Sequence, residues 1–137
     1  MREHGDLPEV DVLIVEDERT VRSVLCKILK EAGYSVTAVE DGLEALANVQ
    51  EYRYRAIVCD LKMPMVDGVR FFEFLESGFP ALADRVLFLT GAAREPGTVD
   101  FLSRTGRPIL EKPYEMKALV RAVAQLVERP PSPGVLI

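Results

Sequence analysis

The sequence is poor in the residues that build zinc sites and disulfide frameworks. It contains two cysteines, Cys26 and Cys59, and one histidine, His4, among 137 residues. The cysteines lie far apart and match no metal-ligand spacing, so we expect two reduced, buried thiols that pack as small hydrophobic groups. His4 lies in the polar N-terminal segment and is interpreted as an ordinary surface residue. Zinc chemistry and histidine-based general base catalysis are therefore disfavoured.

Long apolar runs and an excess of positive charge are also missing. No stretch approaches the roughly 20 apolar residues that a membrane-spanning helix needs, and the N-terminus, MREHGDLPEV, lacks the apolar segment of a secretory signal. The formal net charge is −5, with no stripe of Lys and Arg, which argues against nucleic-acid binding by this chain. We expect a cytoplasmic protein with neither a membrane nor a nucleic-acid partner.

What is present suits one globular domain. The chain has 137 residues, of which 48% are hydrophobic, and typical domains hold about 100–150 residues. Residues 10–128 are predicted to form the domain, preceded by an N-terminal tail at 1–9. Residues 129–137 contain PPSPG, which cannot continue a helix, and are interpreted as a Pro-rich tail or linker.

Short apolar runs alternate with amphipathic segments along this domain. The runs, interpreted as strands buried on both faces, are Val10–Val15, Ser35–Val39, Ala56–Cys59, Arg85–Thr90 and Pro108–Leu110. The segments with helical spacing of apolar residues are Thr20–Ala32, Leu43–Gln50, Val69–Glu76, Thr98–Arg104 and Tyr114–Glu128. Gly91–Gly97 is interpreted as a loop. This alternation predicts an α/β fold with a five-stranded parallel sheet, flavodoxin-like in its strand order 2-1-3-4-5.

Acidic residues follow two strands that are neighbours in this order. Glu16 and Asp17 come after the first strand, and Asp60 after the third. Two carboxylates about 4 Å apart repel each other by about 4 kcal/mol at an effective dielectric constant near 20, so either their pKa values rise or a cation neutralises them. Oxygen ligands of this kind suit Mg²⁺ or Mn²⁺. The sequence therefore predicts a divalent cation at this edge of the sheet.

The residues at the ends of the fourth and fifth strands indicate which reaction the cation would assist. Thr90 ends the fourth strand and Lys112 follows the fifth. A metal ion and a lysine can offset charge on a phosphoryl group, and an aspartate carboxylate can accept such a group covalently. Each residue alone has an ordinary structural interpretation, but their joint placement favours phosphoryl transfer. Nucleotide binding is disfavoured because the acids 16–18 stand where a glycine-rich phosphate loop would be.

Four segments resemble the receiver domains of two-component response regulators. They are VLIVEDE at 12–18, DLKMPMVDG at 60–68, FLTG at 88–91 and EKPY at 111–114. The D-x-x-M-P-x-x-D-G spacing of the second is highly specific, and the resemblance runs from about Val10 to Glu128. It implies a phosphorelay switch that takes its phosphoryl group from a histidine kinase or a histidine phosphotransfer domain. Such a chain is not a conventional enzyme but catalyses its own phosphorylation and dephosphorylation.

The resemblance also implies roles for individual residues. Asp60 would be the nucleophile, while Thr90 and Lys112 would contact the phosphoryl group. Asp17 would bind the metal directly and Glu16 mainly through water. The main-chain carbonyl of Lys62 would complete the protein ligands, together with Asp60.

Further expectations concern the output of the switch. The family usually has a cis bond before the proline that here is Pro113, and an aromatic residue where this sequence has Ile109. An aromatic rotamer switch coupled to Thr90 is therefore not expected. The resemblance places a surface for a second copy or a linked output domain on the fourth helix, fifth strand and fifth helix. The sequence of segment 91–106 resembles receivers attached to hybrid histidine kinases more than it resembles those of transcription factors.

Two alternatives remain open. The first is a receiver-like interaction module that is not phosphorylated, against which the complete set of Asp17, Asp60, Thr90 and Lys112 argues. The second is a Mg²⁺-dependent phosphatase or other hydrolase on a similar sheet. That class needs a second acid two residues after the nucleophile, where this sequence has Lys62.

Overall fold

A five-stranded parallel sheet forms the centre of the molecule, which we describe from a computed structural model. The structure describes residues 6–61 and 68–130. The strand order is β2-β1-β3-β4-β5, and every neighbouring pair is parallel. The strands are β1 (Glu9–Val15), β2 (Val36–Val39), β3 (Arg53–Asp60), β4 (Val86–Thr90) and β5 (Ile109–Glu111). The predicted fold class and strand order are confirmed.

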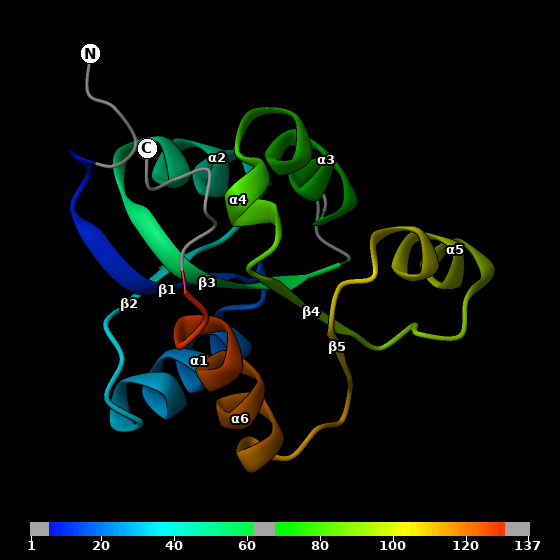
Figure 1. Cartoon of the computed structure of the whole chain (residues 1–137). Helices are drawn as coiled ribbons and strands as arrows, with labels where there is room; N and C mark the ends of the chain where they lie inside the picture. The colour runs from blue at the N-terminus through cyan, green and yellow to red at the C-terminus, as the bar shows by residue number, and fades with distance from the viewer. Residues whose placement is uncertain (1–5, 62–67, 131–137) are drawn as a thin grey trace.

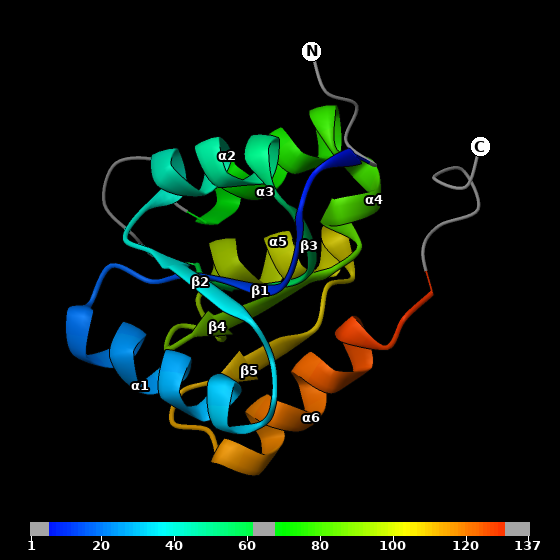
Figure 2. The same ribbon diagram turned by 90° about the vertical axis from the view of Figure 1, so that its left-hand side faces the viewer.

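Helices cover both faces of this sheet (Figures 1 and 2). They are α1 (Arg19–Glu31), α2 (Gly42–Glu51), α3 (Gly68–Gly78), α4 (Pro80–Ala83), α5 (Pro96–Thr105) and α6 (Met116–Val127). Helices α1 and α6 pack on one face, whereas α2, α3 and α4 pack on the other. Helix α5 belongs to the second side, because Phe101 packs against Phe72 of α3 and Phe88 of β4 at centroid distances of 5.7 and 5.3 Å.

The double covering explains why the strands are continuous apolar runs. Successive residues of a strand point to opposite faces of the sheet. In β1, Leu13 and Val15 enter the core under α2 and α3, while Val12 and Ile14 enter the core under α1 and α6. All four are completely buried. The buried polar residues Glu16, Asp60 and Thr90 lie at or directly after the carboxyl ends of strands, and this placement positions the site.

The predicted starts of two strands are too late in the sequence. Strand β3 begins at Arg53 rather than Ala56, and β1 begins at Glu9, inside the segment 1–9 that was expected to be a tail. Glu9 and Arg53 are opposite each other in the sheet, and their side chains form an ion pair at 2.6 Å. Charged residues at the solvent-exposed end of a strand break the apolar pattern, so the pattern alone placed both starts inside the strands.

Two prolines begin helices that the sequence did not predict at those positions. Pro80 begins the short helix α4, which is absent from the predicted helices, and Pro96 begins α5 inside the predicted loop Gly91–Gly97. Proline is tolerated in the first turn of a helix because the N–H that it lacks has no partner there. Strand β5 is also shifted by one residue from the predicted Pro108–Leu110.

The cysteines differ in burial. Cys59 is buried as expected, whereas Cys26 on α1 is only half-buried, and no disulfide joins them. The predicted tail 129–137 lies outside the described residues except for Arg129 and Pro130, and His4 is outside them as well.

Candidate functional site: an acidic pocket at the carboxyl edge

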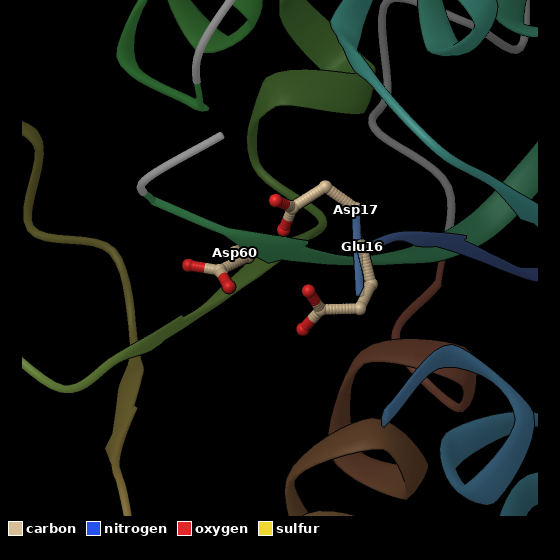
Figure 3. Close-up of side chains that lie close together, drawn as sticks. All are labelled: Glu16, Asp17 and Asp60. Atoms are coloured by element: carbon tan, nitrogen blue, oxygen red, sulfur yellow. The ribbon is translucent and has the colours of Figure 1, made fainter. Parts of the chain in front are cut away.

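Three carboxylates meet at the carboxyl edge of the sheet. Asp60 is the last residue of β3, and Glu16 and Asp17 follow β1, whose Val15 pairs with Cys59 of β3. One carboxylate oxygen from each acid lies within 4.8 Å of the others. Figure 3 shows the three side chains converging on a common space. The predicted gathering of these acids is therefore observed.

The three acids differ in their contact with solvent. Glu16 is 1% exposed and Asp60 is 7% exposed, whereas Asp17 is an exposed residue. Oε2 of Glu16 accepts a hydrogen bond from the Glu18 N–H at 3.1 Å. Oε1 of Glu16 is buried and accepts no hydrogen bond from the described residues. A buried carboxylate oxygen without a hydrogen bond is costly, and a cation in the pocket would remove that cost.

The same crowding affects proton binding. The pKa of Glu16 is raised from its ordinary 4.5 to about 7, chiefly by burial, and the neighbouring Asp60 and Asp17 contribute to the rise. The Glu18 N–H and the charge of Lys112 act in the opposite direction on this pKa. With a pKa of about 7, the Glu16 carboxyl is only partly ionised near neutral pH, mainly because burial disfavours its charged form.

Lys112 supplies a positive charge to this pocket. Its Nζ lies 3.0 Å from Oδ2 of Asp60 and 3.9 Å from Oε1 of Glu16. The Lys112 N–H donates to the carbonyl of Thr90 at 2.8 Å, which holds the residue beside the end of β4. The peptide bond between Lys112 and Pro113 is cis, as expected. Burial lowers the pKa of Lys112, but the hydrogen bond and charge of Asp60 outweigh burial and the net shift is upward. The lysine therefore stays charged.

Thr90 ends β4 at the same edge and is 1% exposed. Its Oγ1 accepts a hydrogen bond from the Ala92 N–H at 3.0 Å. A hydroxyl can donate while it accepts, so Thr90 can still offer its proton to an incoming oxygen. The structure thus brings Asp17, Asp60, Thr90 and Lys112 to one edge of the sheet, with Glu16 beneath them.

Gly68 explains part of the D-x-x-M-P-x-x-D-G motif. A Cβ at this position would lie 2.6 Å from the carbonyl oxygen of Asp60 and 2.8 Å from Cα of Leu61. The Gly68 N–H also donates to the Leu61 carbonyl at 3.1 Å. Only glycine lets the start of α3 pack this closely against the end of β3. Lys62, the predicted carbonyl ligand, lies outside the described residues, as do all residues from 62 to 67.

Two further residues at the site were not singled out from the sequence. Tyr114 lies close enough to Lys112 to feel its charge, and burial raises the pKa of the phenol. Arg22 of α1 donates from Nη1 to the carbonyls of Glu16 at 3.0 Å and Asp17 at 3.3 Å. Nothing in the helical pattern of residues 20–32 distinguishes this arginine from the surface cations around it.

The donor set fits a hard divalent cation. Carboxylate oxygens are the ligands that Mg²⁺ prefers, and Mg²⁺ commonly takes only one or two carboxylates and keeps several waters. Asp17 is exposed and Asp60 and Glu16 are buried, and the three carboxylates lie close together (Figure 3). Oε1 of Glu16, which has no hydrogen bond from the described residues, lies 3.9 Å from the ammonium of Lys112. The residues present therefore fit a magnesium site open to a substrate oxygen.

Known proteins share both the sequence pattern and the fold. The family model for the response regulator receiver domain matches residues 12–124. The response regulator receiver protein CpdR of Brucella abortus is 28% identical over 116 residues, covering 85% of this chain and 95% of CpdR. The response regulator MprA of Mycobacterium sp. strain KMS is 33% identical over 120 residues, which are 88% of this chain but 51% of MprA. The chain thus spans about half the length of MprA.

Solved structures agree with these relatives. The signal receiver domain of a histidine kinase from Syntrophus aciditrophicus is 31% identical, with a TM-score of 0.78 and coverage of 90% of this chain and 96% of that one. The receiver domain of the sensor histidine kinase PA1611 from Pseudomonas aeruginosa is 26% identical, with a TM-score of 0.78 and coverage of 88% and 99%. That structure has a magnesium ion coordinated in its active-site cleft. Within the described part of this chain, no helix has the length and apolar composition to cross a membrane.

Proposed function

The chain belongs to the response regulator receiver domain family of two-component signalling, and on that premise we propose that it is a phosphoacceptor switch with Asp60 as acceptor. The observation that supports this most directly is the 3.0 Å contact between Asp60 and Lys112 inside a pocket that also holds two further carboxylates. An aspartate held beside a fixed cation at the carboxyl edge of a parallel sheet is placed to receive an anionic group.

The proposed reaction begins with a phosphohistidine on a histidine kinase or histidine phosphotransfer domain. An oxygen of the Asp60 carboxylate attacks the phosphorus, and the new O–P bond forms as the N–P bond to the donor imidazole breaks. The imidazole leaves with the electron pair of that bond. Later, water attacks the same phosphorus, which breaks the O–P bond, releases inorganic phosphate and restores the carboxylate. The chain thus catalyses its own phosphorylation and dephosphorylation.

Mg²⁺ or Mn²⁺ supplies electrostatic stabilisation of the phosphoryl oxygens when it is bound. We propose that Asp17 and Asp60 hold it directly, that Glu16 acts through a water molecule, and that the Lys62 carbonyl completes the set. The exposure of Asp17 supports a direct role for this residue, and the deeper burial of Glu16, at 1% exposure, supports a role through water.

Lys112 and Thr90 would respond to the new phosphoryl group. Lys112 now pairs with Oδ2 of Asp60, and after transfer its ammonium can follow the negative charge onto a phosphoryl oxygen. Thr90 can donate its hydroxyl proton to another oxygen of that group. Because the Lys112 N–H is bonded to the Thr90 carbonyl, a movement at either residue is transmitted to both β4 and β5.

We place the output surface on α5, β5 and α6, which correspond to the predicted fourth helix, fifth strand and fifth helix. A second copy or a linked output domain would bind there. Val99 of α5 and Met116 of α6 are exposed apolar residues there, at 44% and 59% exposure. Ile109 of β5 stands where the family commonly has an aromatic residue, so the switch would not use a ring at that position. The proposal covers residues 10–128 as the working domain, in the cytoplasm, without direct nucleic-acid contact.

Acetyl phosphate and Mg²⁺ with intact-mass measurement test the proposal. The wild-type chain should gain one phosphoryl group, and Asp60→Asn should gain none, because the nucleophile is lost. Asp100→Asn, which removes an exposed carboxylate on α5, should behave like the wild type. If the wild type gains no phosphoryl group, and beryllofluoride with Mg²⁺ leaves its NMR spectrum unchanged, the chain is an interaction module instead. Rapid turnover of a phosphomonoester would favour a hydrolase.

A further inference from the structure

The turn between β1 and α1 carries two of the three acids and has unusual hydrogen-bonding needs. Strand β1 ends at Val15 and α1 begins at Arg19. The first carbonyl used by the helix is that of Glu18, which accepts from the Arg22 N–H at 2.9 Å. The carbonyls of Glu16 and Asp17 precede this ladder and need other donors. The orientation of both acidic side chains depends on how these peptide groups are held.

The guanidinium of Arg22 supplies the missing donor. Its Nη1 donates to the carbonyl of Glu16 at 3.0 Å and approaches that of Asp17 at 3.3 Å. On the other side of the turn, the Glu16 N–H donates to the Val39 carbonyl at 3.1 Å, and Oε2 of Glu16 accepts from the Glu18 N–H. The turn is therefore tied to β2, to itself and to α1.

Arg22 differs in this respect from other cations on the same helix. Arg22 is half-buried, whereas Lys27 and Lys30 are exposed. A planar guanidinium can present one N–H group to two neighbouring carbonyls in a fixed geometry, which a flexible ammonium does less well. The contacts of Arg22 are with main-chain oxygens of the acids, so its effect on the pocket is through geometry.

We propose that Arg22 is a positioning residue of the acidic pocket, which holds the Glu16 and Asp17 peptides so that both carboxylates converge on Asp60. The proposal rests on the proposed function, since it concerns how the same pocket is prepared for a cation and a phosphoryl group. Groups that orient metal ligands in this indirect way typically change metal affinity about 10–100-fold when they are removed.

Calorimetric titration with Mg²⁺ alone tests the proposal on four forms of the full chain: wild type, Arg22→Ala, Arg22→Lys and Lys27→Ala. Arg22→Ala should bind Mg²⁺ about tenfold more weakly than the wild type or worse. Arg22→Lys should recover part of this loss because it can still donate to one carbonyl. Lys27→Ala removes the same charge from the same helix without touching the turn, and should bind Mg²⁺ like the wild type.

Urea unfolding of the same variants separates positioning from support of the fold. A purely structural role would lower the unfolding midpoint of Arg22→Ala and leave its Mg²⁺ affinity equal to that of Lys27→Ala, which would overturn the proposal. If Arg22→Ala does not fold, Arg22→Lys carries the test, and an affinity equal to that of the wild type would then overturn it.

The phosphorylation assay distinguishes this failure from failure of the proposed function. A wild-type chain that takes a phosphoryl group on Asp60, with equal Mg²⁺ affinities for Arg22→Ala and Lys27→Ala, would refute the role of Arg22 alone. A wild-type chain that takes no phosphoryl group would refute the proposed function, while the Mg²⁺ comparison would still decide the role of Arg22.

Discussion

The two ends of the central sheet are both rich in charge, but the charges are satisfied in opposite ways. At the amino end, Arg85 donates hydrogen bonds from Nη1 to the carbonyls of Arg55 at 3.1 Å and Leu126 at 2.9 Å. Its Nη2 donates to the carbonyls of Arg129 at 2.8 Å and Pro130 at 2.9 Å. One half-buried guanidinium thus joins the starts of β3 and β4 to the end of α6.

Other arginines at the amino end also have partners within the chain. Arg53 pairs with Glu9 at 2.6 Å, and Arg107 lies 3.6 Å from Asp84. At the carboxyl end, three carboxylates gather, and Lys112 lies within ion-pair distance of two of them, Asp60 and Glu16. One buried oxygen of Glu16 accepts no hydrogen bond from the described residues. Each of these two ion pairs at the amino end joins one cation to one anion, whereas the carboxyl end gathers three carboxylates around one common space. A cluster of like charges of this kind is where a function is to be sought.

Removing Arg85 should have the largest effect, because it should lower stability at the amino end without changing Mg²⁺ binding at the carboxyl end. Arg85→Ala deletes four hydrogen bonds from a charged donor and removes this donor from one carbonyl of β3, one of α6 and two that follow α6. The free energy of unfolding should fall by about 3 kcal/mol, while the affinity for Mg²⁺ should not change. Urea unfolding and calorimetric titration measure the two quantities. Arg121→Ala, an exposed position on α6, is the control. A weakened Mg²⁺ site in Arg85→Ala would show that the two ends are coupled.

Removing charge from Glu16 should have the opposite effect on stability. Because the pKa of Glu16 rises from 4.5 in its ordinary state to about 7 in the folded chain, ionised Glu16 destabilises the fold. The folded state is favoured while the Glu16 carboxyl is protonated, and this contribution to stability is lost as the pH rises from 4.5 through the folded-state pKa of about 7. In the presence of a chelator at pH 8, Glu16→Gln should be more stable than the wild type by an amount on the order of 2 kcal/mol.

The gain in Glu16→Gln should shrink toward pH 5, where the wild-type carboxyl is protonated in the folded state. Urea unfolding at the two pH values measures this difference. Glu73→Gln, an exposed site on α3, should show no such dependence. A loss of stability in chelator-treated Glu16→Gln at pH 8 would mean that this carboxylate is satisfied in the metal-free chain, contrary to the contrast between the two ends.

Asp17 should affect metal binding but not stability. Two opposite unit charges 4 Å apart attract each other by about 4 kcal/mol at a dielectric constant near 20. Losing only a third of this attraction, about 1.4 kcal/mol, already weakens binding about tenfold. Asp17→Asn should therefore weaken Mg²⁺ binding at least about tenfold, with little change in unfolding because Asp17 is exposed. Glu18→Gln, the exposed carboxylate next to it, should bind Mg²⁺ nearly normally. Equal losses in both variants would indicate a diffuse charge effect in place of a ligand.

The central strands could be predicted from the sequence because a strand buried on both faces is a continuous run of apolar residues. Val12–Val15 and Val86–Leu89 are apolar at every position and completely or almost completely buried, so their strands and their order could be predicted. Asp60 and Lys112 are 52 positions apart, yet both could be found because parallel strands end at one edge. The combined placement, not any single residue, made the site predictable.

The parts that could not be predicted depend on contacts between distant backbone groups. Arg85 reaches carbonyls 30 to 45 positions away, and no local pattern reports which carbonyls a helix end leaves exposed. Arg22 and Gly68 are similar cases, since their importance lies in the main chain that they touch. Charged strand starts such as Arg53 were missed because the apolar pattern cannot distinguish an exposed strand end from a loop.

The most direct test of the central claim is to locate the phosphoryl group in the chain. After incubation with acetyl phosphate and Mg²⁺, borohydride reduction converts a phosphorylated aspartate to homoserine, and tandem mass spectrometry then identifies the position. We predict homoserine at position 60 alone, and none when the metal is removed by a chelator. Homoserine at position 17, or metal-independent labelling at other acids, would contradict the account.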